Sequence, residues 1–148
     1  MYYLAQINIA KLLEPIDSPL LEDFVGDLDR INAIADESEG FVWRLQDENG
    51  NATSINPFDD ASFIVNISVW KTVADLKNFV YNSGHLEVFS KRTKWFERMK
   101  TPHMALWWIE VGSFPTAEEG RNKLLELEMN GETESSFSFK KLFEMPKQ

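Results

Sequence analysis

Apolar and polar residues alternate along four segments of the chain, the pattern of β-strands with two unlike faces. In the clearest segment, Phe63, Val65, Ile67 and Val69 alternate with a mixed set that includes Asn66 and Trp70. Each segment has one apolar face and one mixed face. The predicted strands are Tyr2–Ile9, Phe41–Gln46, Ala61–Trp70 and Met104–Val111.

Apolar residues at helical spacing predict helices between and after these strands. Ser18 followed by Pro19 is a helix start, and that pattern continues to Gly40. A second helix is expected over 72–81, and Ser83-Gly84 separates it from a segment that runs to Met99. The last helix begins at a capping box and ends at a glycine, and an apolar tail that should dock on the body follows it. These features are Thr116 with Glu119, Gly131, and Phe137, Phe139, Leu142 and Phe143.

The order of these elements is strand, helix, strand, strand, helix, strand. It predicts an α+β fold, the ferredoxin-like βαββαβ arrangement, with an extra C-terminal helix and tail and a single domain over residues 1–148. We expect the helices to cover one face of an antiparallel sheet. The mixed face then needs a partner, so two sheets are expected to pack face to face in a homodimer, as a dimeric α+β barrel.

Composition excludes several classes of function. The 148 residues carry a formal net charge of -9, which repels phosphate backbones, so we expect no nucleic-acid and no membrane partner. The chain has no cysteine and only two histidines, and its glycines are scattered singly, so no metal, nucleotide or other cofactor is predicted. Without a signal peptide or an apolar membrane span in the sequence, a cytoplasmic location is expected.

The segment after Ser83 places a histidine and an arginine on an apolar stripe. His85, Phe89, Arg92, Phe96 and Met99 follow one another at helical spacing. His85 could move protons near neutral pH, and Arg92 could hold a carboxylate or enolate. The alternative is structural: a satisfied histidine, and an arginine that bridges to a carboxylate such as Glu110 or to carbonyls at a helix end.

A second candidate site lies on the mixed face of the sheet. If Ile7, Val65 and Ile109 face the helices, alternation places a set of polar and aromatic residues opposite them. Apolar walls with a few convergent polar groups are typical of a small-molecule pocket, but the same residues could form a dimer interface. The set contains Gln6 and Ser68 and the predicted ligand-binding residues Asn8, Asn66, Trp70, Trp108 and Glu110.

Two blocks of the sequence combine rare residues at fixed spacing. They are Val69-Trp70 with Leu76, Phe79, Val80, Tyr81, His85, Arg92, Trp95 and Phe96, and Leu106-Trp107-Trp108 with Gly112, Pro115-Thr116, Leu124, Gly131 and Phe137-Ser138-Phe139. These blocks resemble the bacterial domain-of-unknown-function family 3291. One departure is Glu132 after Gly131, where a Gly-Pro pair would be expected. The resemblance covers essentially the full chain and implies a dimeric α+β barrel, the architecture of antibiotic-biosynthesis monooxygenases and haem-degrading enzymes; it implies no activity.

We therefore expect a protein that binds a small, partly apolar molecule. If it is an enzyme, the expected reaction is a cofactor-independent, monooxygenase-like oxygenation or an isomerisation, with His85 shifting protons and Arg92 or Asn8 stabilising an oxyanion. Trp70 and Trp108 would stack the substrate. Two alternatives stay open: a non-catalytic ligand-binding or protein-interaction module, and haem binding or degradation through Asn8 and His85.

Overall fold

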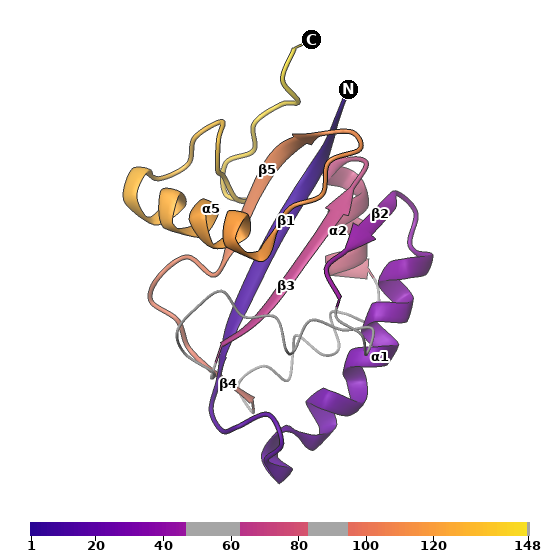
Figure 1. The fold of residues 1–148 in the computed structure, drawn as a ribbon, viewed down its shortest axis with the longest axis vertical. Helices are drawn as coiled ribbons and strands as arrows, with labels where there is room; N and C mark the ends of the chain where they lie inside the picture. Colours follow the sequence, from indigo (N-terminus) through magenta and orange to yellow (C-terminus); the bar gives the residue numbers. More distant parts are fainter. Residues whose placement is uncertain (47–62, 83–94, 148) are drawn as a thin grey trace.

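The fold is a mixed α+β arrangement built on one antiparallel sheet. The computed structural model describes residues 1–46, 63–82 and 95–147. Within these ranges five strands form the sheet, and three α-helices and one short 3-10 turn accompany it (Figure 1). The strands are β1 (Tyr2–Leu12), β2 (Phe41–Arg44), β3 (Phe63–Trp70), β4 (Phe96–Glu97) and β5 (Met104–Glu110); the helices are α1 (Glu22–Glu37), α2 (Val73–Asn82) and α5 (Ala117–Asn130), with the 3-10 turn at Pro19–Leu21.

The first strand of the chain is the centre of the sheet. β1 pairs with β3 along one edge and with β5 along the other, and β2 lies outside β3. Leu4 stands opposite Trp70 on one side and Trp108 on the other. All these pairings are antiparallel, so residues directly opposite one another share a face of the sheet.

Helices cover both faces of this sheet, so the expectation that they lie on one face is wrong. α1 and α2 pack on the mixed face, where Ala35 and Leu76 join a cluster with Leu4. α5 packs on the apolar face, where Leu124 joins a cluster with Ile7. Figure 1 shows α5 crossing in front of the strands and α2 behind them. The apolar face is therefore core of the single chain, and the mixed face lies under α1 and α2.

A glycine allows α5 to lie close to the apolar face. A methyl group at Gly120 would lie 2.7 Å from the Cδ1 atom of Ile7 and 3.0 Å from that of Ile67. Both isoleucines are fully buried, so neither can move aside without disturbing the core. The helix itself is set by local signals, because Thr116 accepts a hydrogen bond from the Glu119 N–H (3.1 Å) and Gly131 ends it with a φ of 71°.

This contact predicts opposite effects for one substitution at two helical glycines. Gly120→Ala should lower the free energy of unfolding by about 1 kcal/mol, since overpacking outweighs the gain in helix propensity. Gly26→Ala should raise it by about 1 kcal/mol, because nothing lies within 4 Å of the new methyl group. Urea unfolding of both variants measures the difference. Equal stabilisation by the two changes would contradict the close approach of α5.

Pairing between distant segments moves two element boundaries away from the sequence prediction, and β2 also ends earlier, at Arg44 and not at Gln46. β1 continues beyond Ile9 to Leu12, and the segment predicted as helix up to Met99 is strand at Phe96–Glu97, which is β4. Phe96 pairs with Leu12, and the Leu13 N–H donates to the Trp95 carbonyl (2.8 Å). These partners are far apart in the sequence, so local periodicity does not reveal them.

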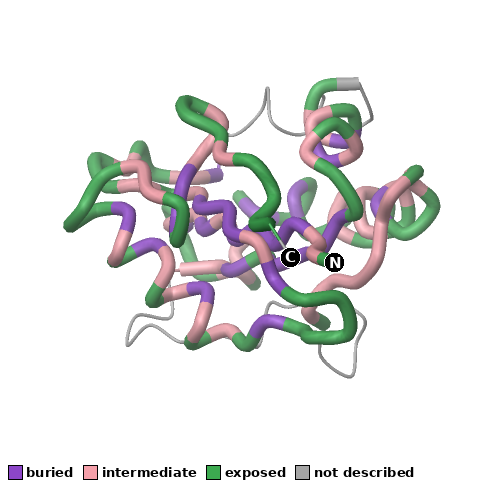
Figure 2. The backbone as a smooth tube through the Cα atoms, turned by 90° about the horizontal axis from the view of Figure 1, so that it is seen from above, coloured by how far each residue is buried: buried purple, intermediate pink, exposed green. Residues whose placement is uncertain are grey.

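Buried residues gather in the strands, whereas the outer sides of the helices are exposed (Figure 2). On the mixed face the apolar residues form two clusters. One contains Leu4, Trp70 and Leu106 and contacts α2 and the end of α1; the other contains Leu12 and Trp95 and contacts the start of α1. Polar side chains of β1 and β3 lie along the strands between these two clusters.

The C-terminal tail docks on the outer edge of the sheet, as its composition predicts. Leu106 of β5 and Phe137 exchange two backbone hydrogen bonds of 2.7 and 2.9 Å, and Phe137 is fully buried. Glu132 accepts hydrogen bonds from the backbone N–H (2.6 Å) and the hydroxyl (2.8 Å) of Ser138. The glutamate that departs from the expected Gly-Pro pair therefore fixes the turn that leads the tail to β5.

Candidate functional site

The polar residues on the mixed face lie in two neighbouring rows across the strands. In one row Ser68 stands between Arg44 and Gln6; in the next, Asn66 stands opposite Asn8. Antiparallel pairing brings such opposite side chains within contact of each other. The register therefore gathers side chains from β1, β2 and β3 at one place on the sheet.

Four of these side chains form a continuous hydrogen-bonded group, which we call the amide cluster: Gln6, Asn8, Asn66 and Ser68. The Gln6 side chain donates from Nε2 to Asn66 Oδ1 (2.7 Å) and to Ser68 Oγ (2.8 Å). Asn8 donates from Nδ2 to Gln6 Oε1 (3.0 Å) and to Asn66 Oδ1 (3.3 Å). Three amides and one hydroxyl thus hold one another in place without any charged group.

The amide cluster runs from the core to the surface. Gln6 is 2% exposed and Ser68 6%, whereas Asn8 is half-buried and Asn66 is exposed. The buried end is anchored by Trp70, whose Nε1–H donates to Ser68 Oγ (2.8 Å). A molecule that approaches this face can therefore reach Asn66 and Asn8, while Gln6 and Ser68 fix the orientation of those two amides from below.

The Ser68 hydroxyl is an acceptor for two buried donors, which predicts a stability effect. Ser68→Ala should lower the free energy of unfolding by about 2 kcal/mol, because the Trp70 N–H is left buried without its acceptor and Gln6 loses one of two. Ser113→Ala, at an exposed serine, is the control and should change stability by less than about 0.5 kcal/mol. Urea unfolding compares the two. A Ser68 variant as stable as the control would argue against the network.

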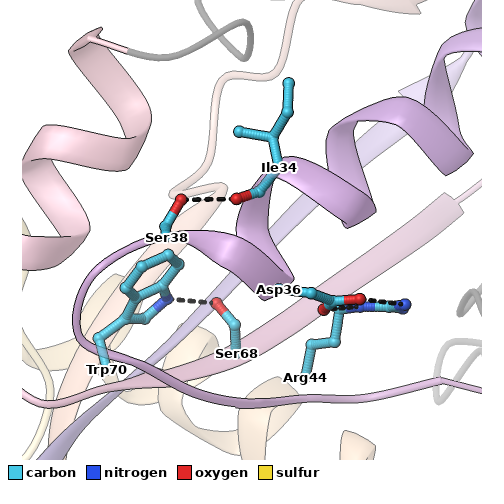
Figure 3. A network of polar contacts seen from close by, with 6 residues as sticks. All are labelled: Ile34, Asp36, Ser38, Arg44, Ser68 and Trp70. Atoms are coloured by element: carbon cyan, nitrogen blue, oxygen red, sulfur yellow. Dashed lines mark hydrogen bonds and ion pairs between the residues drawn. The ribbon is translucent and has the colours of Figure 1, made fainter.

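Arg44 lies on the same face as the amide cluster, a point that the sequence left open. Its guanidinium contacts the Asp36 carboxylate of α1 through two hydrogen bonds, at 2.8 Å from Nε and 3.3 Å from Nη2. Figure 3 shows this pair on one side of Ser68 and the Trp70 indole on the other. A register shift between Phe41 and Trp43 sets the face of Arg44, and for this reason simple alternation along β2 could not assign it.

The structure brings together three of the predicted ligand-binding residues and separates two others. Asn8 and Asn66 belong to the amide cluster, and Trp70 donates to it. Trp108 lies farther along β5, where its indole N–H donates to the Phe143 carbonyl of the tail (3.0 Å). Glu110 stands opposite Tyr2, six residues from the position opposite Asn8, or roughly 20 Å along the strand. It lines an open depression of about 430 Å³ with Met1, Tyr2 and Val111.

The two predicted catalytic residues, His85 and Arg92, lie outside the described residues. The segment 47–60, which is rich in acidic and turn-forming residues, lies outside them as well. The structural alternative, an ion pair between Arg92 and Glu110, is not tested, because Arg92 lies outside the described residues. Their roles stay predictions from the sequence.

Gln6 and Ser68 belong to the site, although the sequence indicates only that they lie on the mixed face. Alternation along a strand gives the face on which a residue lies. It does not give the hydrogen bonds from Gln6 to Asn66 and to Ser68, which span 60 and 62 residues of the chain. The available signal was the coincidence of four polar residues on one face of two strands that are otherwise rich in apolar residues.

Clusters of metal-ligating side chains and long apolar helices are both absent from the part of the chain that the structure describes. Over residues 1–46, 63–82 and 95–147, no group of three or more His, Cys, Asp or Glu side chains could hold a metal ion. None of the helices in these ranges combines the length and the apolar character that a membrane span requires. The hydrogen-bonding chemistry of the amide cluster is that of neutral amides and a hydroxyl.

An antiparallel sheet with helices on both faces, and with the amide cluster on the face of α1 and α2, places the protein among α+β domains. The chain belongs to the family described as a domain of unknown function, DUF3291, whose model matches residues 3–148. None of the curated proteins matches the chain.

The fold also resembles solved structures, among them the following two. The NE2512 protein of unknown function from Nitrosomonas europaea aligns with a TM-score of 0.53 and 11% identity, over 78% of this chain and 97% of that one. PA3566 from Pseudomonas aeruginosa aligns with a TM-score of 0.48 and 15% identity, over 76% and 97% of the two chains. At such identities, the likeness to NE2512 shows a shared fold and nothing of function.

Proposed function

We propose that the protein binds a small, partly apolar molecule at the exposed end of the amide cluster. The observation that carries this proposal is the group of four neutral polar side chains that passes from the buried Gln6 to the exposed Asn66. Amides held in a fixed orientation next to apolar side chains are the usual means of fixing a small ligand.

The cost of burying these groups supports a role beyond stability. Burying polar side chains costs free energy unless each is hydrogen-bonded, and apolar side chains of similar size would fill the same space at no such cost. On both sides of the amide cluster the same strands use apolar residues, namely Leu4 and Leu12 on β1. The polar residues are therefore a local exception on an otherwise apolar part of the face, which is what a recognition site requires.

We also propose that the sheet has a ferredoxin-like topology and that two chains form a homodimeric barrel. The strand order β2-β3-β1-β5, with α1 and α2 on one face, supports a ferredoxin-like topology related to the antibiotic-biosynthesis-monooxygenase-like superfamily. A homodimeric barrel would pair two sheets through the face that carries α5, so a partner would have to pack beside that helix. A monooxygenase-like reaction would depend on His85 and Arg92. For the amide cluster we propose ligand binding and no catalytic step.

Removal of one exposed amide tests the proposal. A fragment library is screened by NMR against the full ¹⁵N-labelled chain, and fragments that shift the side-chain amide signals of Asn8, Asn66 or Gln6 are titrated. Asn66→Ala should weaken their binding by about tenfold or more, because the ligand loses a hydrogen bond at the open end of the cluster. Asn122→Ala, at an exposed amide of α5 on the other face, is the matched control and should leave binding unchanged.

Two results would overturn this assignment. Fragments that bind the Asn66→Ala variant as tightly as the unchanged chain would place binding elsewhere. A screen in which no fragment shifts the three side-chain amide signals would make the amide cluster a structural network.

A further inference from the structure

The exposed end of the amide cluster has two hydrogen-bonding groups that the cluster itself does not use. Asn66 Oδ1 accepts from both Gln6 and Asn8, which leaves the Asn66 NH₂ group available. The Asn8 NH₂ donates twice, which leaves Asn8 Oδ1 available. Within the described residues neither available group makes a further hydrogen bond. The two residues stand directly opposite each other on β1 and β3, so a donor and an acceptor lie side by side.

This pairing of one donor with one acceptor does not depend on which way the amides are turned. If all three amides rotate by 180°, each of the four contacts is kept with donor and acceptor exchanged. The Ser68 hydroxyl permits the exchange, because it can accept from Gln6 Nε2 or donate to Gln6 Oε1 while it still accepts from Trp70. Asn66 then presents its oxygen and Asn8 its NH₂. In both arrangements the outward edge offers one donor beside one acceptor.

Among the described residues, the side chains around this edge are neutral, ion-paired or apolar. The amide cluster contains no ionisable group, and Arg44, on the same face, is held by the Asp36 carboxylate. Met104, which is half-buried, stands opposite Asn8 on the other side of β1. A carboxylate has two acceptor oxygens, whereas this edge offers only one donor beside an acceptor. The amide cluster also contains no cationic side chain to balance the negative charge, so an uncharged ligand suits the site better.

We infer that the ligand carries an acceptor oxygen directly beside an N–H donor, as in a lactam or a primary carboxamide. This inference rests on the proposed function and names the ligand class of the same site. Such an edge pairs with Asn66 and Asn8 through two hydrogen bonds at once. An isostere without the N–H leaves one protein acceptor unpaired, so the site discriminates against it.

Matched pairs of small molecules test the ligand class. The full ¹⁵N-labelled chain is titrated with 2-piperidone and with N-methyl-2-piperidone, and then with benzamide and with acetophenone; benzoate is the charged comparison. The side-chain NH₂ signals of Asn8 and Asn66 report binding at the edge and show which of the two donates. We expect 2-piperidone and benzamide to bind about tenfold or more tightly than their partners without an N–H and than benzoate, and the preference to vanish in Asn66→Ala.

The outcomes separate the ligand class from the proposed function. Equal, saturable shifts of the Asn8 and Asn66 signals by all five compounds would overturn the ligand class and leave the binding site standing, as would tighter binding of benzoate. If none of the five compounds shifts these signals while other fragments of the screen do, the ligand class is wrong and the proposed binding function stands. If no compound of either experiment shifts them, the ligand class and the proposed function both fall.

Discussion

Replacing Trp70 by alanine is expected to lower the free energy of unfolding by about 4 kcal/mol, a large part of the stability of a domain this size. The indole is fully buried, stacks on Phe79 with ring centroids 5.1 Å apart, and meets Phe41 edge to face at 5.5 Å. Its removal leaves a cavity under α2 and deprives Ser68 of a donor. A midpoint of thermal unfolding lowered by about 10 °C would be the measured sign.

Trp70→Phe separates packing from hydrogen bonding at this position. The phenyl ring keeps part of the stacking on Phe79 but lacks the N–H, so the expected loss is about 2 kcal/mol. Both variants should unfold in one cooperative transition. A Trp70→Ala variant within about 1 kcal/mol of the unchanged chain would contradict the burial described for this residue.

The second large effect is expected at Gly40, where β2 begins. Gly40 has a φ of 80°, and a methyl group built there would overlap the Oδ2 atom of Asp75 and lie 2.5 Å from its Cβ atom. Gly40→Ala therefore combines backbone strain with displacement of the first turn of α2, and should cost about 3 kcal/mol. The Lys71 N–H, just before α2, donates a hydrogen bond to the Gly40 carbonyl (2.8 Å), so Gly40 also links the start of β2 to the start of α2.

A glycine with similar backbone geometry and no neighbour provides the control. Gly112 has a φ of 97° and nothing within 4 Å of the added methyl group, so Gly112→Ala should cost only the strain, about 1 to 2 kcal/mol. In the background of Asp75→Ala, the Gly40→Ala change should cost about 1 kcal/mol less than in the unchanged chain, since two of the three close atoms are gone. Equal costs at Gly40 and Gly112, with no coupling to Asp75, would refute the clash.

The parts of the fold that follow from local signals were predictable from the sequence. Alternation along β3 gave its two faces, and Thr116 and Gly131 marked the ends of α5, because these signals act over one or two turns of chain. The face chosen by α5 was not predictable. It depends on the absence of one side chain, at Gly120, against isoleucines from two other strands.

For the candidate site, the sequence likewise predicted the local features and not the contacts between distant segments. Asn8, Asn66 and Trp70 follow from the alternation of the strands, but alternation places a residue on a face without placing it along that face. The register between strands does this, and it moves Trp108 and Glu110 away from the amides. Gln6 and Ser68 could be recognised only from hydrogen bonds between β1 and β3, which one sequence does not contain.

The central position of β1 has a consequence for how the chain folds as it is made. Its partner strands β3, β4 and β5 follow far later in the sequence, up to the pairing of Tyr2 with Glu110. At about 5–20 residues per second of synthesis, β1 waits several seconds for its last partner strand. Contacts so distant in sequence make folding slow, on the order of milliseconds to seconds once the chain is complete. Ile7 and Ile9 therefore emerge from the ribosome long before the sheet that buries them, and molecular chaperones have reason to bind this segment first.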